Sequence, residues 1–286
     1  MDPLKARGSN VGILGLRKLN QITTSLYNFD LRIFAATTLM RRISVFMAEQ
    51  NLKDVDNLAA RLENDKNFFP VFQKQLIVPC TELFRDPEFW RSFHNDVLPL
   101  LENQQDKIRI WVPGCSSGEE ALSTAIMLHE KNLLEKAEIT VTGINQLNLS
   151  ESRSTVYYSK TLDISQNNFR RYCNSDNADI YSFMVEKKDG FVFKDDLYKN
   201  IIYKVFDGLE MPENRGFHVV LCRNYFIYCT PEYQDSLLEI FTRSLLSKGF
   251  LMIGNKEDIS FCSEFNKYMV FNTKEKIYRK KIEYRD

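Results

Sequence analysis

From residue 107 onward, short apolar segments alternate with segments of helical periodicity, and this alternation is the feature that most limits the possible folds. It predicts a mostly parallel sheet with helices on both faces, because parallel neighbours need a crossover connection. A shorter polar segment precedes the last strand, which indicates an antiparallel end to the sheet. We expect strands at 108–113, 138–144, 200–206, 217–222, 248–254 and near 267–280, with helices at 119–132, 147–157 and 231–246.

The connection from the first strand to the first helix is a turn that contains Gly114 and Gly118. Glycine has no Cβ, so the backbone can turn sharply and a ligand can come close. The spacing matches neither G-x-G-x-x-G nor the P-loop pattern. Glu119 and Glu120 at the helix start disfavour a pyrophosphate but could hold ribose hydroxyls or an ammonium group, both present in S-adenosylmethionine. The alternative is an ordinary strand–turn–helix connection without a ligand.

Polar residues also follow the other expected strands. In an open α/β sheet, ligands bind at the carboxyl ends of the strands, near the point where the strand order reverses. Four positions should therefore meet there: the turn 114–118, Gly143–Asn145, Asp207 and Cys222-Arg223-Asn224.

The first part of the chain has helical spacing and few strand signals, as in Leu31–Met47 and Val55–Leu62. Residues 1–53 carry eight lysines and arginines against three acids, which form either a solvated basic face or a docking surface for an acidic partner. Residues 160–200 are less regular, and Lys187-Lys188-Asp189-Gly190 predicts a hairpin turn within them.

Composition excludes several classes of function. Lys+Arg and Asp+Glu both number 38, so net charge does not argue for nucleic acid or for direct membrane insertion. No apolar run is long enough to span a bilayer and residues 1–7 do not resemble the apolar region of a signal peptide, so we expect a cytoplasmic protein. The six cysteines form no C-x-x-C pair and the three histidines are scattered, so we expect no metal site and no Ser-His-Asp triad.

Five segments, in order along the chain, are similar to the motifs of the CheR family of chemotaxis receptor methyltransferases. Any one of them is moderately specific, and five in the right order make chance an inadequate explanation. The first two are Thr81-Glu82-Leu83-Phe84-Arg85-Asp86-Pro87, where the family has T-x-F-F-R-D-P, and Gly114-Cys115-Ser116-Ser117-Gly118-Glu119-Glu120, where it has C-S-T-G-E-E. The third is Ser152-Arg153-Ser154-Thr155-Val156-Tyr157, where the family has A-R-x-G-x-Y. The last two are Leu221-Cys222-Arg223-Asn224-Tyr225-Phe226-Ile227-Tyr228, for F-C-R-N-V-L-I-Y, and Lys248-Gly249-Phe250-Leu251-Met252-Ile253-Gly254-Asn255-Lys256-Glu257, for G-G-Y-L-F-L-G-H-S-E.

The resemblance implies a class I S-adenosylmethionine-dependent methyltransferase sheet, mostly parallel with an antiparallel last strand. A small helical N-terminal domain would occupy 1–75 and the methyltransferase domain 76–286, with a small β subdomain inserted at 160–200. The implied activity is methyl transfer from S-adenosylmethionine to glutamate side chains, leaving S-adenosylhomocysteine, in bacterial chemosensory signalling. The implied partner is the cytoplasmic helical region of chemoreceptors, or a related acidic protein, and we expect a monomer.

The resemblance also implies roles for single residues. Arg85 would hold one oxygen of the acceptor carboxylate, and Tyr228 would orient the acceptor or the methyl donor. The alternatives are a surface ion pair of Arg85 with Asp86 or Glu82, and core packing of Tyr228. The residues expected to line the donor site, besides a supporting Arg223, are Thr81, Arg85, Gly114, Gly118, Glu119, Glu120, Asn145, Asp207, Asn224 and Tyr225.

The chain departs from the family where its second strand ends. An acid there usually grips the ribose hydroxyls, whereas this chain has Gly143 and Asn145. Pro79 and Asp207 both replace asparagines, and Asn255 replaces a histidine. Losing a charged contact typically costs about 1–3 kcal/mol, so several losses could weaken donor binding severely.

Three hypotheses therefore follow from the sequence. The first is an active protein-glutamate O-methyltransferase. The second is a non-catalytic binding or scaffold protein of the same fold with a degenerate donor site. The third is a methyltransferase with another acceptor.

Overall fold

The computed structural model describes residues 11–76, 82–102, 107–114, 117–145, 149, 155–205 and 216–282. The chain divides into two compact units. The helical unit comprises Met1–Val78 and Phe226–Ser236, and the sheet unit comprises Pro79–Tyr225 and Leu237–Asp286. Each unit is described by itself below. No helix of the described chain is long and apolar enough to cross a membrane.

Four α-helices and the short 3-10 helix η2 build the described part of residues 1–78 in the helical unit, around an apolar core. The sequence predicted helical structure across Leu31–Met47 and Val55–Leu62, and α2 and α3 lie in these stretches. Asp54 begins α3 because its side chain accepts a hydrogen bond from the Asn57 N–H. The bounds are α1 (Ile13–Tyr27), η2 (Leu31–Ile33), α2 (Ala36–Glu49), α3 (Val55–Asn64) and α4 (Phe68–Leu76).

A late segment of the chain returns to this unit. It consists of η7 (Phe226–Tyr228) and the start of α10 (Pro231–Ser244). The backbone N–H of Ala35 donates to the Tyr228 carbonyl at 2.9 Å, and that of Thr230 donates to the Ile33 carbonyl at 2.9 Å. The helical unit is therefore assembled from two distant parts of the sequence.

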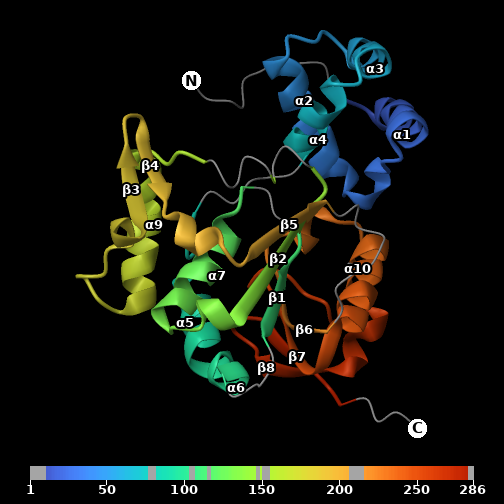
Figure 1. Ribbon diagram of the computed structural model, residues 1–286. Helices are drawn as coiled ribbons and strands as arrows, with labels where there is room; N and C mark the ends of the chain where they lie inside the picture. The colour runs from blue at the N-terminus through green and yellow to red at the C-terminus, as the bar shows by residue number, and fades with distance from the viewer. Residues whose placement is uncertain are drawn as a thin grey trace. The chain divides into compact units, whose positions relative to one another are not determined.

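The sheet unit contains a seven-stranded sheet in the order β5-β2-β1-β6-β7-β9-β8 (Figure 1). The pairs β1–β2, β1–β6, β2–β5 and β6–β7 are parallel, whereas β9 runs antiparallel to both β7 and β8. The structure thus confirms the predicted mostly parallel sheet with an antiparallel end. The strands are β1 (Ile108–Val112), β2 (Ala137–Gly143), β5 (Ile201–Val205), β6 (Phe217–Cys222), β7 (Leu245–Ile253), β8 (Tyr268–Asn272) and β9 (Ile277–Lys280).

The two faces of β1 pack against different elements because side chains alternate along a strand. Ile110 and Val112 join the core cluster that includes α7 (Glu119–Glu130). Trp111 points the other way, where its ring meets Phe241 of α10 edge-on with 5.2 Å between centroids. These contacts place the Gly-rich turn after β1 on a rigid, two-sided core.

Two predictions of secondary structure were wrong, and a third lies mostly outside the described residues. That third prediction is the helix at 147–157, where Leu149 is helical and Tyr157 forms an isolated antiparallel bridge with Phe191. A 15-residue helix, α9 (Ser159–Cys173), follows it within the stretch expected to be irregular. The single strand expected near 267–280 is a pair, β8 and β9, joined by a turn.

The predicted hairpin at Lys187–Gly190 is present. Its strands β3 (Met184–Lys187) and β4 (Gly190–Phe193) are antiparallel, and Lys187 pairs with Gly190 across a turn formed by Lys188 and Asp189. This small two-stranded sheet stands apart from the seven-stranded sheet in strand pairing.

Candidate functional site

The strand order of the main sheet reverses between β1 and β6. β2 and β5 follow on one side of β1, and β7 follows on the far side of β6. Ligands of open α/β sheets bind at the carboxyl ends beside such a reversal. Gly114 follows β1, Arg223-Asn224-Tyr225 follow β6 and Gly254 follows β7, so these segments meet at this edge.

Gly114 and Tyr225 lie against each other at the turn after β1. A Cβ placed on Gly114 would come within 2.7 Å of the Tyr225 ring, and the Gly114 backbone has a φ of +71°. Gly118, with a φ of +96°, begins α7 as its N-terminal cap. Both glycines are therefore required by backbone conformation, and Gly114 is also required by space.

Glu119 is the first residue of α7, and its carboxyl is buried. Its side-chain atom Oε2 has no hydrogen-bond partner among the described residues. Burial raises the pKa of Glu119 to about 7, while the hydroxyls of Ser117 and Tyr157 act in the opposite direction. A buried acceptor without a donor is costly, so this carboxyl suits a ligand that brings hydroxyl or ammonium donors.

Glu120 lies on the same turn of α7 beside a second set of charges. Its Oε1 is 3.5 Å from Nη1 of Arg223. Burial raises the pKa of Glu120 to about 7, and the Glu257 carboxylate adds to the rise, whereas Arg223 and Arg85 oppose it. Near neutral pH the charge of this carboxyl therefore depends on its arginine neighbours.

The loop that carries Arg85 is fixed by the two residues that precede the arginine. The Leu83 N–H donates to Ser165 Oγ at 3.1 Å, and the Phe84 N–H donates to Ser123 Oγ at 2.9 Å. The buried Phe84 ring stacks on Tyr172 with 4.6 Å between centroids. These contacts tie the loop to α7 and α9, so Arg85 stands on a rigid base.

Arg85 lines a polar groove of about 410 Å³ in the sheet unit. The groove combines cationic, anionic and amide side chains from residues 82–86, the start of α5 (Pro87–Ser92), α9, the segment after β7 and the β8–β9 turn. Its lining residues are Glu82, Arg85, Asp86, Pro87, Glu88, Asn168, Arg171, Asn255, Lys274 and Glu275. Such a mixed lining suits a charged or zwitterionic ligand.

The carboxyl end of β6 is held by an acid that the sequence reasoning did not assign to the site. Glu257 Oε2 accepts hydrogen bonds from the Asn224 N–H at 3.0 Å and from the Gly254 N–H at 2.6 Å. Asn224 adopts a left-handed conformation with φ of +57°. Glu257 closed the last quoted motif, and an acid just beyond a strand's carboxyl end was the signal that could have identified it.

Other predicted site residues have different placements. Asn145 follows β2 and is buried. Thr81 and Asp207, like Pro79, lie outside the described residues. Tyr228 belongs to the helical unit, where its carbonyl accepts the Ala35 N–H.

An ion pair with Asp86 or Glu82 was the alternative role of Arg85, and the structure gives Asp86 a cationic partner of its own. Asp86 pairs with Arg223, whose Nη2 lies 2.6 Å from Asp86 Oδ2. The sequence reasoning gave Arg223 a supporting role, and this contact places it against the Arg85 loop. Across the described chain, no group of three or more His, Cys, Asp or Glu side chains could hold a metal ion.

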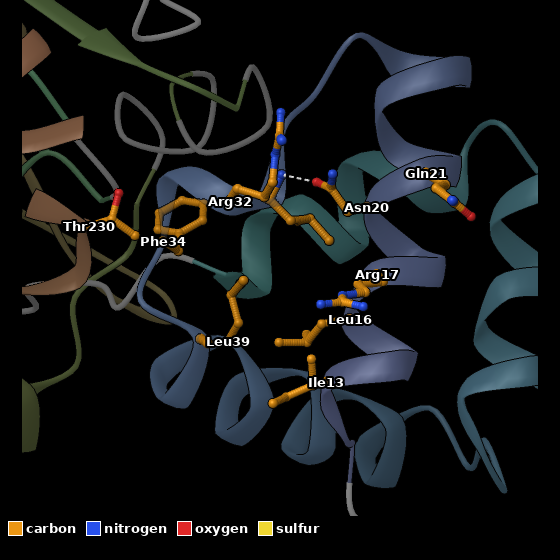
Figure 2. Close-up of a pocket in the computed structure, with 11 residues that line it drawn as sticks. Ile13, Leu16, Arg17, Asn20, Gln21, Arg32, Phe34, Leu39 and Thr230 are labelled. Atoms are coloured by element: carbon orange, nitrogen blue, oxygen red, sulfur yellow. Dashed lines mark hydrogen bonds between the residues drawn. The ribbon is translucent and has the colours of Figure 1, made fainter. Parts of the chain in front are cut away.

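The helical unit has a cavity of its own, of about 480 Å³ (Figure 2). Leu16, Phe34 and Leu39 give it an apolar lining, and Arg17 and Arg32 add cationic side chains. Arg32 is tied to Asp30 at 2.7 Å. The full lining is Ile13, Leu16, Arg17, Asn20, Gln21, Leu31, Arg32, Phe34, Ala36, Leu39 and Thr230.

The strand order, the antiparallel β9 and the Gly-rich turn after β1 together define a class I S-adenosylmethionine-dependent methyltransferase. Residues 80–277 match the family described as CheR methyltransferase, SAM binding domain. The chain therefore belongs to the CheR methyltransferase family, and S-adenosylmethionine is its cofactor.

Relatives agree with this assignment. The chain is 28% identical to Cher3 of Pseudomonas putida over 254 residues, which cover 89% of this chain and 92% of that protein. It is 27% identical over 231 residues to the chemotaxis protein methyltransferase of Listeria monocytogenes, covering 80% of this chain and 84% of that protein. The comparisons lend no support to the non-catalytic hypothesis.

Proposed function

We propose that this methyltransferase esterifies glutamate side chains in the cytoplasmic helical region of bacterial chemoreceptors. The observation that carries the proposal is the placement of Arg85. It stands on a fixed loop, lines a polar groove, and acts electrostatically on Glu120 in the first turn of α7, beside the proposed S-adenosylmethionine site. A guanidinium in that position can hold a carboxylate acceptor, because its donors match two carboxylate oxygens.

The proposed methyl transfer does not require the protein to remove a proton from the acceptor. S-adenosylmethionine supplies an electrophilic methyl group on a sulfonium. A glutamate side chain is already ionised at neutral pH, with a reference pKa of about 4.3, so no general base is required. Arg85 would align the acceptor oxygen and exclude water from it, since catalysis here rests on orientation and desolvation.

The residues of the turn fit the cofactor. The unpartnered Oε2 of Glu119 is a buried acceptor that ribose hydroxyls or the methionine ammonium would satisfy. Gly114, Gly118, Glu120, Asn224 and Tyr225 are proposed to line the same site. Thr81, Asn145 and Asp207 complete the proposed donor set.

Asn145 stands where the family's ribose-binding acid would be expected. It offers one acceptor oxygen where a carboxylate would offer two, so we propose that Glu119 supplies the missing acceptor. Tyr228 is proposed to orient the acceptor or the donor. The proposed domains are 1–75 and 76–286, with a β subdomain at 160–200.

The acceptor would dock on the helical unit. The helical unit has an apolar cavity that Arg17 also lines, and residues 1–53 carry an excess of basic residues. These features suit an acceptor helix with an apolar stripe and acidic flanks. A cytoplasmic, monomeric enzyme acting on the cytoplasmic part of a receptor is the setting that we propose.

The test of catalysis uses the full chain and a purified receptor cytoplasmic fragment. Calorimetry with S-adenosylhomocysteine measures the donor site, and mass spectrometry of receptor peptides locates methyl esters. We expect binding and glutamate methylation by the native chain, and much slower but measurable methylation with retained product binding for Arg85→Ala. Absence of binding at millimolar product, or methyl transfer to a residue type other than glutamate, would refute the proposal.

The docking part of the proposal has a matched pair of variants on α1. Ile13 lines the cavity and Leu14 does not, yet both are exposed, at 64% and 79%. We expect Ile13→Asp to raise the KM for the receptor fragment about tenfold, and Leu14→Asp to leave it within about twofold, while product binding stays unchanged in both. Equal effects of the two variants would exclude this cavity as the docking site.

A further inference from the structure

Arg223 joins three segments of the sheet unit at the carboxyl end of β6. Its side chain is only 2% exposed. Nη2 pairs with Asp86, Nη1 donates to the Arg85 carbonyl at 3.1 Å, and Nη1 also lies 3.5 Å from Glu120. One guanidinium therefore connects the strand end, the Arg85 loop and the first turn of α7.

Aromatic rings hold this guanidinium in a fixed plane. Its carbon Cζ lies 4.0 Å from the centroid of the Phe89 ring and 6.0 Å from that of Trp90. The Arg223 guanidinium stacks on a ring and at the same time donates to a carboxylate and to a carbonyl. This combination depends on the planar shape of the guanidinium, which the lysine ammonium group does not have.

The backbone around Arg85 is held in a conformation that it would not adopt unaided. Phe84 and Asp86, the residues on either side, have φ of +51° and +57°. This left-handed region is unfavourable for residues with a Cβ, so it persists only where the surroundings impose it. The Arg85 carbonyl between them receives two donors, Trp90 Nε1 at 3.0 Å and Arg223 Nη1 at 3.1 Å.

We propose that Arg223 is a positioning residue for catalysis: it clamps the Arg85 carbonyl and the Asp86 carboxylate, and so holds Arg85 where it lines the polar groove. The inference rests on the proposed function, since it takes Arg85 as the residue that aligns the acceptor carboxylate. Arg223 itself touches neither acceptor nor donor in this scheme.

A double-mutant cycle tests whether Arg223 acts through Arg85. We expect Arg223→Met to lower kcat about a hundredfold, the loss typical of a misaligned catalytic group. Arg223→Lys should recover only a small part of this loss. Adding Arg223→Met to Arg85→Ala should cause no further loss, because the group that it positions is already gone.

Arg279 provides the matched control. Its guanidinium also lies over a phenylalanine ring, Phe250, at 5.2 Å, and its Nε donates to a backbone carbonyl, that of Lys248. It is remote in sequence from the Arg85 loop. We expect Arg279→Met to leave kcat within about twofold; a loss as large as that of Arg223→Met would show that removing any such arginine suffices, and would overturn the inference.

A spectroscopic measurement tests the clamp without activity. The chain has two tryptophans, so its indole N–H region contains two NMR signals. Trp90 shares the Arg85 carbonyl with Arg223, whereas Trp111 donates to Thr142 Oγ1 at 2.9 Å. We expect Arg223→Met to shift the Trp90 signal and leave the Trp111 signal in place.

The outcomes separate the two proposals. If the native chain does not methylate receptor glutamates, the proposed function fails, and the Trp90 shift still decides whether Arg223 holds the loop. If native methylation occurs but the Arg85→Ala and Arg223→Met losses multiply, the positioning role is wrong. Should Arg223→Met fail to fold, Asp86→Asn serves instead, since it removes the negative charge that pairs with Arg223 and leaves Arg223 on Phe89. Full activity of that variant with an unmoved Trp90 signal would overturn the inference.

Discussion

Replacing Gly114 by alanine should destabilise the sheet unit through two separable effects. The backbone there has a φ of +71°, and an L-residue in the left-handed region costs roughly 1–2 kcal/mol. The added Cβ would also lie 2.7 Å from the buried Tyr225 ring, and overpacking of this kind typically costs about 1–3 kcal/mol. We therefore expect Gly114→Ala to lower the free energy of unfolding by about 3 kcal/mol.

Urea unfolding followed by circular dichroism measures this change, and a second substitution divides it. In the Tyr225→Ala background the steric part should vanish, so Gly114→Ala should cost only the backbone part, about 1–2 kcal/mol. Gly12→Ala is the control, because its φ is −84° and nothing lies within 4 Å of the added Cβ. Full stability of Gly114→Ala, or strict additivity with Tyr225→Ala, would refute this account of the turn.

Two further predictions concern buried polar groups near the same turn. Burial raises the pKa values of Glu119 and Glu120 to about 7 from an ordinary value of 4.5. Between pH 4.5 and about 7 the folded chain therefore binds more protons than the unfolded chain. The free energy of unfolding should consequently fall as the pH rises through this window. Urea titrations at several pH values should show this slope flattened in Glu119→Gln/Glu120→Gln, and an unchanged slope would contradict the assigned cause. Ser123→Ala should cost about 1–3 kcal/mol, because it leaves the buried Phe84 N–H unpaired, whereas Ser236→Ala, which removes a bond from an exposed hydroxyl, should be nearly neutral. Thermal unfolding of the two variants compares them, and equal losses would argue against the Ser123 contact.

The strands of the sheet could be predicted because buried strands consist mostly of apolar residues. β6 is buried along its whole length, from Phe217 to Cys222, and every residue of this run except His218 is apolar. The turn after β1 was equally visible, since Gly114 and Gly118 are the residues that its conformation requires.

The α9 helix escaped prediction for a physical reason. Its buried positions include Ser165, Gln166 and Asn168, which are satisfied by specific hydrogen bonds rather than by apolar packing. These polar residues interrupt a buried face that also contains Leu162 and Phe169, so the apolar pattern of the helix is weak. The split of the last segment into β8 and β9 was missed similarly, because exposed Met269 and Val270 resemble core residues in the sequence.

The sequence could predict only those residues of the candidate site that belong to a recognisable motif. Motif positions located Arg85, Glu119 and Asn224. They did not reveal that Glu257 would fix the Asn224 backbone, or that Asp86 would pair with Arg223, because those contacts depend on segments distant in the sequence. Such pairings arise from the fold and have no local pattern.

The return of Phe226–Ser236 to the helical unit bears on how the chain is made. The four helices before residue 77 leave the ribosome early, yet the partners of Ile33 and Ala35 are Thr230 and Tyr228. During synthesis these helices must wait for most of the sheet unit to be translated before their unit is complete. A chimera that exchanges only residues 1–75 would likewise separate these partners, so a transplant of this unit should carry both segments.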